Sequence, residues 1–400
     1  MTRTDCVVTG IDVLAPTGLT VDEYWRRTCL GESGIRVVDD FDRRYRSALA
    51  GVIPDFVARD HLPGRLIAQT DRVTQLALVA AERAFADAKV DLDHRDPFEC
   101  AVVTSNATGG FEFSHREMRR LWTEGRESVS VYQCFAWFYA VNTGQISIRH
   151  RLRGPGAVLV AEQSGGLDAL GHARRIIRRG RCSMAIAGGM ESSFDPWGWV
   201  SHQASGALSP AREPAAGYRP FSPAADGYVP GEGGAMLVLE ACDTVELGTV
   251  YGRIAGYASG FDPRDDPTYT RPLHRVLTTA LADAELRPGD IDVVFADAAG
   301  TRAADKAEAT VLAEVFGPHG VPVAAPKSGT GRLMAGAGPL DVVCALLALR
   351  DNVIPPAPQV PSTDLPIDLV CGRARATPLT TALVLARGAG GFHSALVLRK

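Results

Sequence analysis

The pattern of apolar positions predicts strands alternating with helices along the whole chain. Short apolar runs bounded by polar or glycine-rich segments are typical of buried strands. They occur at Cys6–Gly10, Cys100–Thr104, Ala157–Ala161, Met184–Ala187, Ala235–Glu240, Tyr251–Ser259, Val293–Ala296, Pro322–Ala325, Thr381–Ala386 and Ala395–Leu398. Apolar residues at helical spacing predict helices at Val21–Leu30, Thr70–Val90, Phe111–Glu124, Asn142–Arg151, Leu167–Ile177, Leu273–Ala284, Asp305–Phe316 and Gly338–Arg350.

This alternation predicts an α/β layered fold with mostly parallel sheets. The order of elements is similar before and after residue 250, which favours a duplication, although no repeat is evident at the level of single residues. A length of 400 residues suits two similar halves or one large layered domain.

A strand, a sharp turn and a helix meet at the centre of the chain. Ala157–Ala161 is expected to be a buried strand, and Gly165 and Gly166 allow a sharp turn into the helix that follows. Gln163 then lies at a helix N-terminus, where free N–H groups favour negative charge. A thiol at such a position has a lowered pKa and can act as a nucleophile, whereas an amide cannot form a thioester.

Composition narrows the class of protein. A net charge of −4 argues against general nucleic-acid binding, and no apolar run approaches the ~20 residues that span a bilayer. The N-terminus lacks the regions of a signal peptide, so the cytoplasm is the expected compartment. The eight cysteines are scattered and are read as small buried hydrophobic residues.

Other polar groups predict no metal or nucleotide site. The glycine clusters Gly231–Gly234 and Gly329–Arg332 lack the spacing of dinucleotide and phosphate loops. His115, His150, His172 and His202 have no second ligand at metal spacing and are read as packing or surface histidines. A run of arginines between Arg174 and Arg181 is interpreted as a solvated helix face, with a landing patch for an acidic carrier protein as the alternative.

One predicted helix has a face that two interpretations fit. Phe111, Ser114 and Met118 follow one another at spacings of three and four residues, so they share one side of the helix. Such a stripe is ordinary for core packing. A stripe that lines an apolar tunnel has the same spacing.

Several long motifs are distinctive, namely the central segment Val160–Arg174, Ser128–Tyr132, Phe135–Tyr139 with Asn142–Gln145 and Arg153–Pro155, and Asp195–Val200. They resemble the chain length factors, the ketosynthase β subunits of bacterial type II aromatic polyketide synthases. Pro220–Ser222 with Asp226–Gly234 resembles the thiolase-fold ketosynthases generally, and the resemblance covers essentially the whole chain.

The resemblance implies the thiolase fold, with duplicated halves in a layered αβαβα arrangement. It places an N-terminal ketosynthase-like half at residues 1–245 and a C-terminal one at residues 246–400. It also implies a heterodimer with a catalytic ketosynthase α subunit, and an acyl carrier protein whose phosphopantetheine arm brings malonyl and polyketide thioesters. No metal or organic cofactor is implied.

The chain departs from the condensing members of that family at three positions. Where they have the nucleophilic Cys this chain has Gln163, and where they have two catalytic His residues it has Ala299 and Arg332. Lys327 of their Lys-Ser motif remains. Condensation needs a thiolate to hold the acyl chain and imidazole donors to stabilise the enolate, so the chain is expected not to condense by itself.

The resemblance leaves three hypotheses for function. In the first, Phe111, Ser114 and Met118, with Trp197 or Trp199 nearby, wall a tunnel for a mid-length to long polyketide. In the second, Gln163 assists decarboxylation of a malonyl thioester; a glutamine that only fills the vacated pocket is equally compatible with the sequence. The third, an independent condensing enzyme that uses Cys134, lacks a strand–turn–helix before that cysteine.

Overall fold

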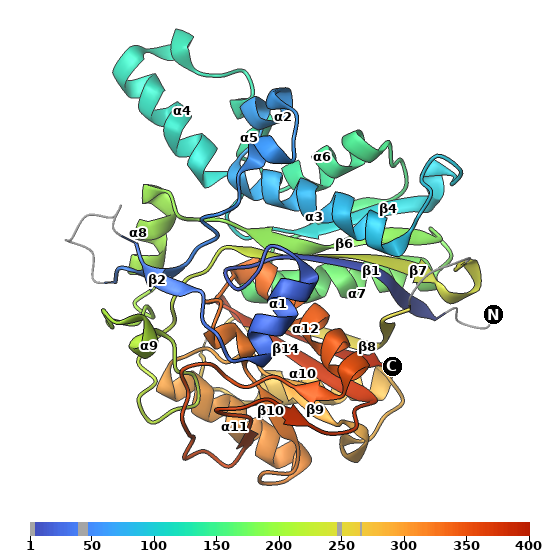
Figure 1. The fold of residues 1–400 in the computed structure, drawn as a ribbon, viewed down its shortest axis with the longest axis vertical. Coiled ribbons are helices and arrows are strands. Elements are labelled where there is room, and N and C mark those ends of the chain that lie inside the picture. The colour runs from blue at the N-terminus through green and yellow to red at the C-terminus, as the bar shows by residue number, and fades with distance from the viewer. Residues whose placement is uncertain (1–4, 39–46, 246–249, 265) are drawn as a thin grey trace.

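The computed structural model describes residues 5–38, 47–245, 250–264 and 266–400. Its main feature is one sheet of eleven strands, accompanied by two small two-stranded sheets (Figure 1). The strands of the main sheet are β1 (Cys6–Leu14), β4 (Cys100–Ser105), β5 (Gly156–Leu159), β6 (Met184–Glu191), β7 (Gly233–Ala241), β8 (Gly252–Phe261), β9 (Val293–Phe295), β10 (Pro322–Ala324), β12 (Asp368–Leu369), β14 (Thr381–Gly388) and β15 (Phe392–Arg399). The small sheets pair β2 (Ile35–Val37) with β3 (Leu49–Gly51), and β11 (Val353–Ile354) with β13 (Arg375–Ala376).

The strand order repeats, which confirms the duplicated architecture. Across the sheet the order is β12-β10-β9-β14-β15-β8-β1-β7-β6-β4-β5. The five strands of the first half and five of the second, β8, β9, β10, β14 and β15, follow the same internal order, and β12 extends the second half at its edge. Among the described residues, two pairs join the halves between β1 and β8, Val7 with Arg253 and Val8 with Gly252. The predicted boundary at 245/246 stays a prediction, because residues 246–249 lie outside the described residues.

The expectation of mostly parallel sheets is wrong. Of the ten strand pairs in the main sheet, five are parallel and five antiparallel. One reason lies in the turn between β14 and β15, which is only three residues long and contains Gly390 and Gly391 at positive φ. So short a turn can join only antiparallel strands, because a parallel pair needs a long crossover.

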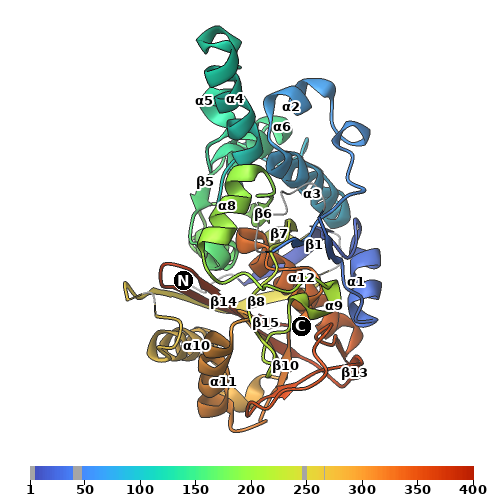
Figure 2. The ribbon, with the colours of Figure 1, turned by 90° about the vertical axis from the view of Figure 1, so that its left-hand side faces the viewer.

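Helices cover both outer faces and fill the space between the halves of the sheet (Figures 1 and 2). The apolar face of α3 (Arg72–Ala88) packs on the first half. The central α7 (Gly165–Arg178) and the almost entirely buried α12 (Ala337–Asp351) share one core with both halves. On the far side, α10 (Arg271–Asp283) and α11 (Arg302–Phe316) cover the second half. This is the αβαβα layering that the resemblance implies.

The remaining helices lie at the ends of the layers. A group projects beyond the first half of the sheet in both views (Figures 1 and 2), namely α2 (Gly64–Gln69), α4 (Phe111–Glu124) and α5 (Gln133–Ala136). The others are α1 (Val21–Cys29), α6 (Val141–His150), α8 (Pro196–Ala204) and α9 (Pro214–Gly217). Within the described residues, no helix combines the length and apolarity that crossing a bilayer requires.

Two burial predictions need correction. The strand predicted at Ala157–Ala161 is not buried, because β5 lies at the edge of the sheet and its residues are half-buried or exposed. Arg174 does not belong to a solvated face. Its guanidinium is buried, donates to the carbonyls of Ile254 and Ala255, and pairs with Asp283 at 2.7 Å.

Candidate functional site

The central turn lies between the end of β5 and the start of α7. A 3₁₀ turn, Glu162–Ser164, connects them, and Gln163 is completely buried there. Glu162 has a φ of +49°, a conformation that costs free energy for a non-glycine residue. Its Oε2 accepts hydrogen bonds from the backbone N–H of Gln163 at 2.6 Å and of Ala389 at 3.1 Å. The turn is therefore fastened to the β14–β15 connection of the other half.

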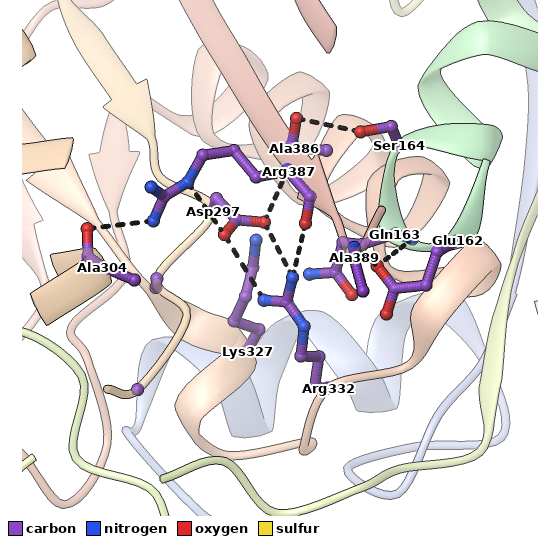
Figure 3. A network of polar contacts seen from close by, with 12 residues as sticks. Glu162, Gln163, Ser164, Asp297, Ala304, Lys327, Arg332, Ala386, Arg387 and Ala389 are labelled. Carbon is purple, nitrogen blue, oxygen red and sulfur yellow. Dashed lines mark hydrogen bonds and ion pairs between the residues drawn. The ribbon is translucent and has the colours of Figure 1, made fainter. Parts of the chain in front are cut away.

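The amide of Gln163 has no hydrogen-bond partner among the described residues. Both Nε2 and Oε1 are buried and unpaired. Figure 3 places this side chain between Ala389 and the guanidinium of Arg332. A buried amide with neither end satisfied costs free energy that a ligand could recover. One interpretation of the sequence is that Gln163 only fills the vacated pocket and satisfies its own hydrogen bonds. The unpaired amide does not fit the second part of that interpretation.

Arg332 is held in a buried network around Asp297 (Figure 3). Its Nη2 donates to the carbonyl of Arg387 at 2.6 Å, and both terminal nitrogens lie 3.4 Å from the Asp297 carboxylate. Asp297 Oδ1 also accepts from the backbone N–H of Arg387 at 2.8 Å. The Arg387 side chain reaches the same carboxylate at 3.4 Å and Glu308 at 3.5 Å.

The charges of this network fix its protonation. Burial favours the neutral form of Asp297, but the cations of Arg332, Arg387 and Lys327 outweigh it and lower the pKa of that carboxyl. Burial opposes the charge of Arg332, yet Asp297 and Glu162 raise its pKa above the usual value. Arg332 is therefore permanently charged, and its terminal N–H groups point to the Asp297 carboxylate and the Arg387 carbonyl.

Lys327 lies on the second half's counterpart of the central turn. It belongs to a 3₁₀ turn, Pro326–Ser328, that follows β10. Its Nζ donates to the carbonyl of Ala296 at 2.6 Å and pairs with Asp341 at 2.5 Å. Burial raises the pKa of Asp341 to about 6, against the opposing effect of the lysine. Both partners of this ion pair are almost completely buried.

A cavity of about 350 Å³ opens beside these groups. Ala299 and Arg332, which the sequence predicts at the positions of the two catalytic histidines, lie on its wall. Glu162 from the central turn is on the wall as well, whereas the completely buried Gln163 next to it is not. The other lining residues are Ser205, Ala207, Tyr228, Asp262, Asp266, Pro267, Asp297, Thr301, Ala304, Arg387, Gly388, Ala389, Gly391 and His393.

The predicted tunnel residues form a separate group that does not line this cavity. On α4, Ser114 is buried and accepts a hydrogen bond from Gln133 Nε2 at 2.8 Å, while Phe111 and Met118 are half-buried. Phe111 meets the ring of Trp197 edge-on, with centroids 6.5 Å apart.

The two tryptophans differ in exposure. Trp197 is 43% exposed, whereas Trp199 is completely buried and packs on Phe194 inside this subunit. Trp197 can therefore face a partner, and Trp199 can only support α8 from within.

Sequence reasoning missed the acidic half of the site. Asp297 pairs with both Arg332 and Arg387, and Glu308 pairs with Arg387. Glu308 also accepts hydrogen bonds from the backbone N–H groups of Asp297 and Ala298. A signal was present, because Asp297 and Arg387 each follow directly on an apolar strand. Charged residues at such positions are buried only when they are paired.

The alternative nucleophile suggested by the sequence, Cys134, does not lie at the cavity. Cys134 is exposed on α5 and is not among the lining residues. Over the described ranges, His, Cys, Asp and Glu side chains form no group of three that could hold a metal ion.

Comparison with known proteins places the chain in a family. Models of the β-ketoacyl synthase N-terminal and C-terminal domains match residues 3–244 and 251–360. The tetracenomycin polyketide synthase ketoacyl synthase β subunit of Streptomyces glaucescens is 54% identical over 98% of this chain and 98% of its own length.

Solved structures agree with this placement. The ishigamide ketosynthase/chain length factor superposes with a TM-score of 0.91 at 25% identity, over 100% of both chains. A chain from the complex of a type II polyketide synthase acyl-carrier protein with its ketosynthase gives 0.90 at 27% identity, over 100% of this chain and 99% of that one. The chain therefore belongs to the β-ketoacyl synthase family, within the group of ketosynthase β subunits, or chain length factors, of type II polyketide synthases.

Proposed function

We propose that this chain is the non-condensing β subunit of a ketosynthase heterodimer, in which it shapes the polyketide tunnel and sets chain length. The observation that carries the proposal is the central turn, which keeps the geometry of a nucleophile's position but presents an amide. Condensation requires a thiolate and imidazole donors. The amide of Gln163, the methyl group of Ala299 and the ion-paired guanidinium of Arg332 cannot replace them.

The purified chain without an α subunit is expected to release no ketide from malonyl carrier protein. Its complex with the cognate α subunit is expected to release polyketides under the same conditions. Mass spectrometry of both reactions checks this. Chain extension by the isolated chain would contradict the proposal and support an independent condensing enzyme.

An exposed edge supports the heterodimer. Among the described strands β5 pairs with β4 alone, so its other edge is available to a partner. Large apolar side chains are exposed on this strand's end and on α8 and the segment after α5, namely Trp137, Phe138, Val160, Trp197 and Val200. Trp137 and Phe138 are in ring contact, and exposed apolar side chains that meet in this way favour a protein interface.

The second partner is an acyl carrier protein, because a related ketosynthase was solved in complex with one. Its phosphopantetheine arm delivers malonyl and polyketide thioesters to the heterodimer. Phe111, Ser114, Met118 and Trp197 would then border the growing chain on the β-subunit side, with Trp199 behind them.

A second role, in priming, is favoured by the orphaned amide of Gln163. We propose that its Nε2 donates to the carbonyl oxygen of a malonyl thioester and stabilises the enolate that forms when carbon dioxide leaves.

Gln163→Ala is expected to slow carbon dioxide release from malonyl carrier protein about tenfold, because one hydrogen bond to a developing charge is lost. The assay uses a heterodimer whose α subunit carries Ala in place of its nucleophilic Cys. Gln163→Leu, which keeps most of the side-chain volume, separates the alternatives. Full activity of the leucine variant would mean that Gln163 only fills space.

A further inference from the structure

A chain of hydrogen bonds runs through the core beside the cavity. The Oγ of Ser193 lies 2.8 Å from Nε2 of His202, and Nδ1 of His202 lies 3.2 Å from the hydroxyl of Tyr228. That hydroxyl is also 3.4 Å from the Oγ of Ser205. Ser193 and His202 are buried and do not line the cavity, whereas Tyr228 and Ser205 do. The chain therefore ends on the cavity wall.

The end of this chain faces the vacated catalytic positions. Tyr228 lines the same cavity as Ala299 and Arg332, where condensing relatives have histidines. In both contacts the hydroxyl oxygen of Tyr228 can be the acceptor. Its own proton can then be directed to a molecule in the cavity.

The surrounding groups keep this hydroxyl neutral and oriented. Burial lowers the pKa of His202 to about 4, so the imidazole is uncharged at neutral pH. Burial and the nearby carboxylate of Glu162 raise the pKa of Tyr228, and the opposing effects of Ser205 and the Arg332 cation do not outweigh them. The hydroxyl therefore keeps its proton at neutral pH.

Other polar groups on the wall are poorer donors. Arg332 and Arg387 are engaged with Asp297, which is ionised. Glu162 already accepts two backbone N–H bonds at one oxygen. His393 also lines the cavity and is the competing candidate that the experiment must separate.

We propose that Tyr228 is the proton donor that completes decarboxylative priming, an inference that rests on the proposed role of Gln163. The bond between the carboxylate carbon and the α-carbon of the malonyl thioester breaks, and carbon dioxide leaves. The electron pair stays on the α-carbon as the enolate. The Tyr228 hydroxyl then gives its proton to that carbon, which yields the acetyl thioester, and solvent at the cavity mouth restores the phenol.

The test uses facial selectivity, which a structural role would not change. The heterodimer with the inactive α subunit is given 2-methylmalonyl carrier protein in D₂O, and the α-deuterated propionyl product is analysed for chirality. A donor fixed on one wall delivers deuterium to one face of the enolate, so the unmodified protein is expected to give one enantiomer in excess. Tyr228→Phe is expected to give a racemic product, because solvent then protonates both faces of the enolate.

Matched variants keep each outcome informative. Tyr251→Phe removes a hydroxyl that bonds Asp87 elsewhere in the fold and is expected to keep both rate and selectivity. Selectivity that survives in Tyr228→Phe but disappears in His393→Gln would overturn the assignment to Tyr228. No carbon dioxide release by the unmodified heterodimer would overturn the priming role and this inference together. Release that is lost in Gln163→Ala but unaffected in rate and selectivity by Tyr228→Phe would overturn the inference alone.

Discussion

Asp297→Ala is expected to lower the free energy of unfolding by about 3–5 kcal/mol, the range typical when one partner of a buried ion pair is removed. The carboxylate is completely buried and faces the guanidinium groups of Arg332 and Arg387. Without it, two buried cations keep their charge and lose their principal counter-ion. Urea unfolding of the purified heterodimer, followed by tryptophan fluorescence and circular dichroism, measures the change.

An exposed pair in the same half provides the control. Asp364 forms a two-pronged ion pair with Arg302 on the surface, where solvent screens the attraction. Asp364→Ala is therefore expected to leave the denaturation midpoint almost unchanged. Equal effects of the two substitutions would mean that the Asp297 network does not stabilise the fold.

Met118→Trp is expected to shorten the polyketide by at least one two-carbon unit. The side chain is half-buried on α4, on the face that carries Phe111 and Ser114, so added volume would project into the space proposed for the growing chain. A closely packed wall does not yield to a larger ring without strain, so the last extension loses its room. Mass spectrometry of the products formed with the cognate α subunit and carrier protein gives the chain length.

Two further variants separate length control from damage to the fold. Met118→Leu nearly conserves volume and is expected to keep the original product. Ser114→Trp is a harsher test, because Ser114 is buried and bonded to Gln133, so its complex must first be shown to assemble. Unchanged product lengths with Met118→Trp would refute the assignment of this face to the tunnel.

Hydrophobic periodicity was sufficient for most of the fold. It predicted α4 at its observed bounds, and most other long helices and strands to within a few residues, because one apolar face or run dominates each of them. It missed the two-residue strands β11, β12 and β13, which are too short to carry a pattern. The same periodicity predicted β5 as a buried strand, because the residues of this edge strand are as apolar as those of an interior strand.

The site was only half visible in the sequence. Gln163, Lys327, Ala299 and Arg332 could be found because they stand in recognisable motifs. The bonds of Asp297 to Arg332 and Arg387 join residues far apart in the chain, and no local pattern encodes such a pairing. The tunnel assignment depends on a companion subunit as well as on this chain, so it stays a prediction.

The repeated strand order has a consequence for the history of this molecule. Each half places a strand, a tight turn and a central helix at the same point of its plan, so the region around Gln163 is braced from two directions by independent copies of one design. A backbone arrangement of this kind tolerates substitution of the side chain at the turn, because its shape does not depend on that side chain. If the proposed function holds, evolution could replace the reactive groups of one subunit and keep the shape that borders the growing polyketide.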